Sequence, residues 1–409
     1  MTERAHLASE KVEGFWLDDP VHRAWLKSDA LRQLEFFKSS MRPEGGFHLL
    51  DWHGNPLATD VQELHSTTRL VHSFALGHQF GVAGADDVID HGMSYLFDAH
   101  RDQTFGGYFW SRDSAGPVDD KKLAYGHVFV LLAGASAKLA GHPKADELIE
   151  DVTTILNERF WEEDAGLFAD EWNRDWTPFS TYRGMNANMH AVEALLTAFE
   201  ATSLPEYLEK AGRILEFFIG RIAPEYSWRL PEHYNAQWQV DLAYAGNPMF
   251  RPNGTTPGHS FEFARLHLQH WDLAGRPDTG APKAARHTME TALRDAWSEE
   301  GGFFYTLDAQ GQPAIRDRYW WPVTEAIGVL AAFIKLERNP ADEDWYRRVW
   351  RFAHDHFVDH DAGAWFHELD ADGRAIEALF AGKGDIYHAL QADLFPLARG
   401  ISRLDLSAA

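Results

Sequence analysis

Side chains able to move protons recur about every 60 residues in this chain, each near the start of an apolar segment with helical periodicity. From His65 the steps run 62, 63, 69, 66 and 63 residues, and they reach these side chains: His127, His190, His259, Glu325 and His388. Imidazole titrates near neutral pH and is the group that most often transfers protons in enzymes. The series therefore indicates acid–base chemistry, provided that the fold brings its members together.

Two of these histidines lie in denser polar segments than the others. His259 follows Thr-Pro-Gly and precedes Glu262 by three residues, and His388 follows the segment Lys383-Gly-Asp-Ile-Tyr. Residues three apart share one face of a helix, so Glu262 can hydrogen-bond His259 and fix its tautomer. We therefore favour His259 and His388 as functional residues over the other histidines, most of which are expected at the surface or at caps.

A metal site is the alternative use of the same residue types. Among the histidines of the repeat series, the pattern His-x-x-Glu occurs twice, at His190 and at His259. Helical bundles that bind two metal ions use the opposite order, Glu-x-x-His, with further carboxylates on partner helices. The sequence therefore predicts no metal ligands.

The elements that must position these residues repeat with the same period. Apolar, alanine-rich helices are predicted directly after the polar residues, over 69–76, 128–139, 191–199, 261–268, 326–336 and 389–397. Amphipathic helices are predicted between them, over 30–39, 88–98, 144–160, 207–222, 282–296 and 342–357. Gly-Gly-aromatic turns follow the amphipathic helices, and alternating segments at 303–311 and 365–373 predict short hairpins.

Six helix pairs closed into a ring form an all-α (α/α)6 barrel, and we expect one such catalytic domain over residues 1–409. In that fold the equivalent polar residues converge at one mouth, which the short β-hairpins would line. A seven-unit toroid and an open solenoid are the alternatives. A solenoid needs polar capping repeats at its ends, and we find none in the sequence.

Composition excludes several classes of partner. Lys and Arg number 38 against 62 Asp and Glu, and a net charge of −24 argues against nucleic acid and anionic membranes. The chain has no cysteine, which excludes disulfides and thiolate ligands. Residues 1–20 lack the apolar core of a signal peptide, and no segment approaches the ~18 apolar residues of a membrane span, so we expect a cytoplasmic protein.

Taken together, these segments resemble the N-acylglucosamine 2-epimerase superfamily. The resemblance runs over residues 18–398 and rests on the repeat, Asn186 with His190, the Thr-Pro-Gly-His259-x-x-Glu262 block and the Asp-Ile-Tyr-His388-Ala-Leu-Gln block. The last block is similar to the mannose isomerase and sulfoquinovose isomerase branch. The resemblance implies an (α/α)6 barrel, a monosaccharide substrate, a monomer or homodimer, and aldose–ketose isomerisation without a cofactor.

The resemblance also implies roles for individual positions. His259 and His388 match the paired acid–base histidines, and Arg69 matches the arginine that faces the reacting oxygens. The matches to sugar-binding or helper positions are Asn186, His190, Glu262, Trp321, Glu325 and Arg251. The match of Arg251 is weaker, because its spacing to the histidine can vary within the family.

Three other functions stay open at this point. A 2-epimerase acting on a free or N-acylated sugar shares the first half of the reaction. A glycoside hydrolase or lyase would need two carboxylates flanking the scissile bond, for which Glu262 and Glu325 could be invoked. A sugar-binding protein without catalysis would not need two equivalently placed histidines.

Overall fold

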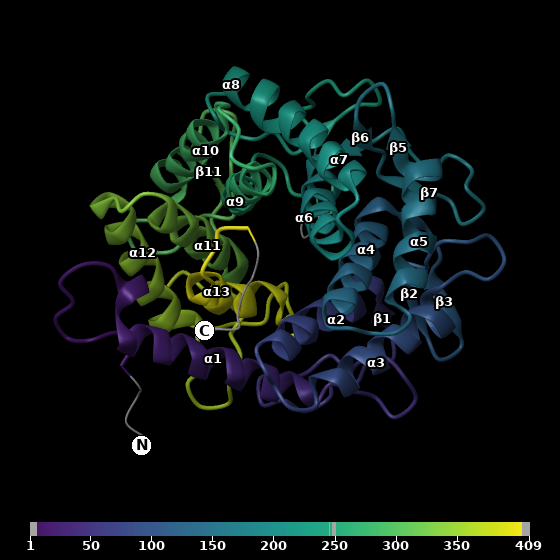
Figure 1. The fold of residues 1–409 in the computed structure, drawn as a ribbon, viewed down its shortest axis with the longest axis horizontal. Coiled ribbons are helices and arrows are strands. Elements are labelled where there is room, and N and C mark those ends of the chain that lie inside the picture. Colours follow the sequence, from purple (N-terminus) through teal and green to yellow (C-terminus); the bar gives the residue numbers. More distant parts are fainter. Residues whose placement is uncertain (1–5, 245, 248–250, 403–409) are drawn as a thin grey trace. The chain divides into compact units, whose positions relative to one another are not determined.

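The computed structural model describes residues 6–244, 246–247 and 251–402 (Figure 1). The chain separates into two compact units. The first unit comprises Met1–Ser39, Leu50–Asn55 and Thr255–Ala409, and the second comprises Ser40–Leu49 and Pro56–Gly254. The single domain over residues 1–409 stays a prediction. No helix within the described ranges is long and apolar enough to cross a membrane.

The second unit is built on apolar helices that pack side by side in chain order: α2 (Leu64–Gln79), α4 (Ala124–Leu139) and α6 (Met185–Thr202). Each packs against the amphipathic helix that follows it: α3 (Ala85–Tyr95), α5 (Ala145–Ile155) and α7 (Pro205–Leu215). The short α8 (Ala223–Glu225) comes after α7. In α4 the segment from Gly126 to Ala137 is buried without interruption, because small and β-branched side chains face helices on several sides.

The first unit repeats this arrangement (Figure 1). Its apolar helices also contact one another in chain order: α9 (Pro257–Leu273), α11 (Trp320–Leu336) and α13 (Tyr387–Leu397). The helices that pack on them are α10 (Ala281–Ala296), α12 (Pro340–Phe352) and α1 (Pro20–Lys38). The helix α1 follows the single turn η1 (Trp16–Asp18) and packs on α13, so the two ends of the chain form one helix pair.

Most outer helices end in a π-helical turn: η2 (Leu96–His100), η3 (Leu156–Phe160), η4 (Glu216–Ile222) and η5 (Ala353–Phe357). A glycine-containing turn follows most of the outer helices, and Gly46, which comes after α1, shows why. Its φ is +72°, and a Cβ there would lie 1.7 Å from Gln62 Oε1. That oxygen accepts the Phe47 N–H at 2.7 Å, which ties the turn to the residues just before α2.

The same tie recurs in the next two repeats of the second unit. Tyr108 N–H donates to His127 Nε2 at 3.1 Å, and Phe168 N–H donates to Asn188 Oδ1 at 2.8 Å. The side chains of Gln62, His127 and Asn188 thus accept the equivalent backbone N–H in successive repeats. A polar residue at the start of an inner helix therefore need not belong to an active site.

The strands are short and antiparallel. In the second unit they pair as β1 (Gln62–Glu63), β2 (Ser111–Asp113) and β3 (Gly116–Asp119); β4 (Lys122–Leu123) with β7 (Glu171–Trp172); β5 (Trp161–Glu162) with β6 (Leu167–Phe168); and β8 (Arg183–Gly184) with β9 (His233–Tyr234). In the first unit β10 (Thr306–Leu307) pairs with β11 (Pro313–Ile315), and β12 (Arg318–Tyr319) pairs with β13 (Glu368–Leu369).

The two predicted hairpins have different outcomes. The hairpin at 303–311 is confirmed by β10 and β11, whose pairing extends to Ile315. The hairpin predicted at 365–373 is present in a shorter form, in which an antiparallel bridge joins Leu369 to Ala375 across the turn, and its strand β13 also pairs with β12. The strand β12 directly precedes α11, so this pairing fixes the start of that helix.

The predicted helices are all present, but several begin earlier than their apolar pattern indicates. The helix predicted over 69–76 runs from Leu64, and the one predicted over 30–39 begins at Pro20. In α1 the buried side chains of His22, Asp29 and Gln33 interrupt the apolar pattern. Buried polar residues therefore hid the first turns from a periodicity argument.

Lys383 is a structural anchor of the first unit. Its fully buried ammonium donates to Asp359 Oδ2 at 2.6 Å, to the Gly363 carbonyl at 2.7 Å and to the Trp52 carbonyl at 3.0 Å. We expect Lys383→Met to lower the free energy of unfolding by about 3 kcal/mol, because it leaves a carboxylate and two carbonyls without this donor. Urea unfolding followed by circular dichroism measures the change. Lys38→Met, which removes an ammonium paired with the exposed Glu35, is the control and should cost under about 1 kcal/mol; equal losses would contradict the assignment.

Candidate functional site

In the first unit the two favoured histidines meet at one indole ring. His259 lies in the first turn of α9, Trp321 in the first turn of α11 and His388 in the first turn of α13. The ring centroids of His259 and Trp321 are 5.0 Å apart, and those of Trp321 and His388 are 5.8 Å apart. Gly258 permits this packing, since a Cβ there would lie 2.2 Å from the indole. Neighbouring inner helices thus bring together imidazoles that are distant in the sequence.

A carboxylate orients His388. Its Nδ1 lies 2.9 Å from Glu325 Oε1, and the other oxygen of Glu325 accepts from Arg265 Nη2 at 3.0 Å. All three side chains are buried. A carboxylate that accepts the Nδ1–H leaves the lone pair on Nε2, which is the arrangement that a general base requires.

Glu325 stays ionised in this setting. Burial by itself would raise the pKa of its carboxyl group, but the guanidinium of Arg265 and the hydrogen bond from His388 outweigh burial and hold that pKa below its usual value. A negative charge beside His388 stabilises the imidazolium that forms when the ring accepts a proton. Glu325 therefore contacts His388 in this structure, whereas the resemblance implied a sugar-binding or helper position for it.

Glu262 is the second buried carboxylate of this cluster. Its Oε1 is 4.0 Å from Arg265 Nη2, so one guanidinium lies between two glutamates. Ligand atoms of Glu262, Glu325 and His388 lie within 4.8 Å of one another. These are residue types that could hold a divalent cation, but Arg265 already supplies positive charge to both carboxylates.

In the second unit two predicted residues, Arg69 and His190, both contact Tyr125. Arg69 Nη2 donates to the Tyr125 hydroxyl at 2.9 Å, and its guanidinium lies 4.6 Å from the centroid of the Phe129 ring. The His190 ring meets both aromatic rings, at 5.3 Å from Tyr125 and 4.7 Å from Phe129. Consecutive inner helices α2, α4 and α6 supply these side chains.

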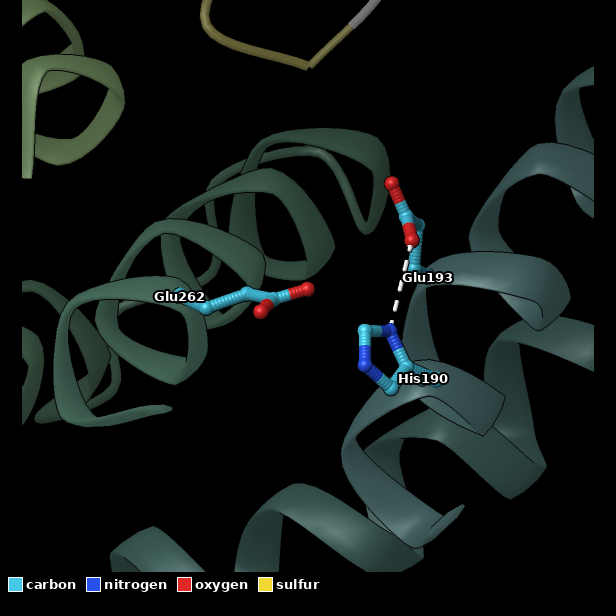
Figure 2. Close-up of side chains that lie close together, drawn as sticks. All are labelled: His190, Glu193 and Glu262. Carbon is cyan, nitrogen blue, oxygen red and sulfur yellow. Dashed lines mark ion pairs between the residues drawn. The ribbon is translucent and has the colours of Figure 1, made fainter. Parts of the chain in front are cut away.

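His190 also has a carboxylate neighbour on its own helix. Its Nδ1 lies 3.8 Å from Glu193 Oε2, one turn along α6, and Figure 2 shows this pair. The figure also shows Glu262 projecting from the separate helix α9. The spacing of three residues between His190 and Glu193 produces the shared helix face that the sequence indicated.

A cavity of about 300 Å³ in the second unit contains two of the predicted sugar-binding residues. Asn186 and Arg251 line it together with Tyr125. The remaining lining residues come from the strands and loops around α4 and α6: Trp110, Asp119, Lys121, Leu123, Asp170, Glu171, Tyr182, Ala187, Tyr244 and Asn247. This volume is at the lower end of the range for small-molecule sites, and aromatic rings among hydroxyl, amide and charged groups suit a sugar.

Two of the acidic residues that line this cavity, Glu171 and Asp170, interact with Arg251. Arg251 forms a two-pronged ion pair with Glu171, at 2.9 Å and 3.2 Å, and its guanidinium lies 3.9 Å from the centroid of the Tyr182 ring. Next to Glu171, burial raises the pKa of Asp170 to about 7, although Arg251 and the Gly184 N–H, which donates at 2.7 Å, both oppose the rise. Asp170 therefore titrates near neutral pH.

This pKa predicts how stability depends on pH. Unfolded Asp ionises near pH 4, so between about pH 4 and pH 7 the unfolded state has lost its proton while folded Asp170 keeps it, and the wild type loses stability as pH rises. Asp170→Asn retains an acceptor for the Gly184 N–H without the charge. We expect this variant to be more stable than the wild type by up to about 4 kcal/mol at pH 8, with the difference vanishing near pH 4. Urea unfolding across this pH range measures it, and a difference independent of pH would contradict it.

Two histidines of the repeat series, His127 and His65, make contacts of another kind than those of His259 and His388. His127 is fully buried, its Nδ1 donates to the Leu123 carbonyl at 2.7 Å and its Nε2 accepts the Tyr108 N–H, so both nitrogens serve the backbone. His127 therefore has a structural role. His65 stacks on Trp110 with centroids 5.1 Å apart. The equivalence of position along the repeat did not distinguish structural from functional members.

Sequence reasoning missed Tyr125, Arg265 and Glu171. Tyr125 lies two residues before His127, and only His127 belongs to the repeat series from which the candidates were chosen. Arg265 follows Glu262 by three residues, a spacing that indicates contact on a helix. Glu171 carries no local signal, because its partner Arg251 is far away in the chain.

Comparisons with known proteins find relatives that match over nearly the whole chain. The sequence profile described as N-acylglucosamine 2-epimerase (GlcNAc 2-epimerase) matches residues 45–392. The chain is 40% identical over 390 residues to D-mannose isomerase of Thermobifida fusca, covering 93% of this chain and 96% of that protein. It is 37% identical over 394 residues to D-mannose isomerase of Pseudomonas cannabina pv. alisalensis, covering 93% and 94%.

A solved structure extends the similarity to three dimensions. A crystal structure of D-mannose isomerase superposes with a TM-score of 0.87 at 32% identity, covering 91% of this chain and 97% of that one. The predicted fold class, an all-α protein of the (α/α)6-barrel type with short strand pairs, is confirmed. The similarity spans almost the whole chain and includes both units.

Proposed function

Because this chain belongs to the N-acylglucosamine 2-epimerase family and is a sugar isomerase, we propose that it interconverts D-mannose, or a close relative such as D-lyxose, and the corresponding 2-ketose without a cofactor. For mannose the product is D-fructose. The substrate is a free monosaccharide, and we expect the protein to act in the cytoplasm as a monomer or homodimer within a single catalytic domain.

The observation that carries this proposal is the pair of imidazoles at one indole. His259 and His388 flank Trp321, and Glu325 orients His388. Isomerisation needs two proton-transfer tasks at one sugar, the opening of the ring and the movement of a proton between C2 and C1. Two histidines at one aromatic surface supply a group for each task, and each can contribute about 10²–10⁴-fold to the rate.

We assign the carbon proton to His388. Glu325 accepts from its Nδ1, so Nε2 removes the proton from C2, and the ring returns that proton to C1 on the same face of a cis-enediol. His259 assists by exchanging protons with the ring oxygen and the C1 hydroxyl during ring opening, and by passing to O1 the proton that O2 loses as the carbonyl moves from C1 to C2. The roles of the two histidines can be told apart, because only the variant lacking the carbon base fails to exchange the C2 hydrogen of the open-chain sugar.

The second unit supplies the groups for binding and charge stabilisation in this proposal. Arg69 stabilises the enediolate, an interaction of about 3–4 kcal/mol in comparable sites. Asn186 and Arg251 hold sugar hydroxyls in the cavity that they line, and His190 assists ring opening.

The positive charge that balances Glu262 and Glu325 comes from a side chain of the protein, Arg265. Arg265 contacts Glu325 and lies 4.0 Å from Glu262, so neither carboxylate needs a metal ion for neutralisation. We therefore expect activity to survive treatment with EDTA. Loss of activity in EDTA with recovery on addition of a divalent cation would favour the group of Glu262, Glu325 and His388 as a metal site.

The deciding experiment incubates the EDTA-treated protein with mannose, lyxose and N-acetylmannosamine in D₂O and identifies the products by NMR. We expect fructose from mannose, with deuterium incorporated at C1 or C2. Glucose as the sole product, or turnover of N-acetylmannosamine alone, would identify a 2-epimerase instead. No turnover of any of these sugars would overturn the proposal.

A further inference from the structure

The cations that line the cavity of the second unit are already neutralised. Among the described lining residues these are Lys121 and Arg251. Lys121 pairs with Asp119 at 2.6 Å, and Arg251 pairs with Glu171 at 2.9 Å. Because Asp170 is a third lining acid, acidic residues outnumber basic ones on this wall.

The ion pair between Arg251 and Glu171 is stabilised by several further contacts. Both oxygens of Glu171 accept from the guanidinium, and the Ser180 hydroxyl donates to Oε1 of Glu171 at 2.6 Å. The other side of the guanidinium faces the Tyr182 ring. A two-pronged pair between planar groups is geometrically specific, and the low exposure of Glu171, 8% of its side chain, reduces screening by solvent.

We propose that Glu171 makes this cavity selective for uncharged sugars, because it neutralises Arg251 and so excludes sugar phosphates and similar anions. This inference rests on the proposed function, which places the sugar in the cavity. A guanidinium has five N–H donors and the pair with Glu171 uses two of them. Arg251 thus remains able to donate to a neutral hydroxyl while it offers an anion little net attraction.

Removal of one charge tests the proposal. Glu171→Gln keeps an acceptor for Arg251 but not the negative charge, so a phosphate group would meet an uncompensated guanidinium. We expect mannose 6-phosphate to bind this variant at least about tenfold more tightly than the wild type. Isothermal titration calorimetry with mannose 6-phosphate and with inorganic phosphate measures this at low salt, and the gain should diminish at high salt.

Two further variants separate charge from structure. Glu163→Gln removes a carboxylate that pairs with Arg213 away from the cavity, and it should leave phosphate binding at the wild-type level. Glu171→Asp keeps the charge and should keep the exclusion. In the isomerase assay Glu171→Gln should raise KM for mannose more than it lowers kcat, because the altered group binds the sugar and does not move protons.

The outcomes distinguish this inference from the proposed function. Equal affinity of the wild type, Glu163→Gln and Glu171→Gln for mannose 6-phosphate would overturn the role of Glu171, even if mannose is isomerised. Tighter binding by Glu171→Gln alone would support it, even if no sugar is turned over, because the titration needs no catalysis. If Glu171→Gln does not fold, Asp119→Asn decides, since it frees Lys121 in the same cavity from a more exposed position; unchanged phosphate binding there would overturn the inference.

Discussion

Replacement of His388 by alanine is expected to lower kcat for mannose by about 10³-fold or more and to abolish exchange of the C2 hydrogen with solvent deuterium. The His388 ring is buried, is held by Glu325 at Nδ1 and lies against Trp321, and both of these residues belong to the neighbouring inner helix α11. Removal of a positioned general base typically costs 10²–10⁴-fold, and here the exchanged proton is the one that the reaction moves.

NMR of mannose in D₂O reads the exchange directly, independently of net product formation. His78→Ala, which removes a histidine paired with the exposed Asp86, should retain wild-type exchange. His388→Asn, closer in size, should be as inactive as the alanine variant if the imidazole itself does the chemistry. Near-normal exchange in either His388 variant would remove this residue from the mechanism and transfer the carbon proton to His259.

The parts of the fold that were predictable are those determined by local pattern. The helices from Ala124 and from Trp320 are apolar on nearly every side, and only a helix enclosed by others tolerates that composition. Their starts were placed late, as in α1, where the buried polar groups of Asp29 and Gln33 bond to Trp365 and Asp393, which are distant in the sequence. Periodicity detects apolar faces and gives no information about such partners.

The candidate site also contains residues that the local sequence pattern predicted and residues that it did not predict. His259 and His388 stood out because each opens an inner helix after a turn, and the first unit brings both to Trp321. The partners Arg265 and Glu171 were not predicted, since the contact of Arg265 with Glu325 joins separate helices and that of Arg251 with Glu171 joins a loop to the strand β7. Such contacts follow from which helices and loops are neighbours, which one sequence does not specify.

Glu325 is the residue whose loss should affect both activity and stability. Glu325→Gln removes the charge that orients His388 and stabilises its protonated form, and we expect kcat to fall by about 10²–10³-fold with little change in KM. It also leaves the buried Arg265 without its closest counter-charge, which should lower the free energy of unfolding by about 3–5 kcal/mol at pH 7. Steady-state kinetics and urea unfolding measure the two effects.

A second substitution separates these two effects. Arg265→Met combined with Glu325→Gln removes both charges of the pair, so part of the lost stability should return, less what Glu262 loses when its cationic neighbour at 4.0 Å disappears. Activity should not return, because His388 still lacks its carboxylate. Recovery of kcat in the double variant would show that Glu325 serves only to balance Arg265.

The pH dependence of stability gives an independent check of Glu325. Arg265 and His388 hold the pKa of this carboxyl below its value in the unfolded chain despite burial. The ionised carboxylate therefore stabilises the fold fully above about pH 4.3, and this contribution is lost as pH falls from there toward the lowered pKa. The deficit of Glu325→Gln should accordingly be largest above pH 5 and shrink in acid, and a deficit that grows on acidification would mean that Glu325 is protonated in the native protein.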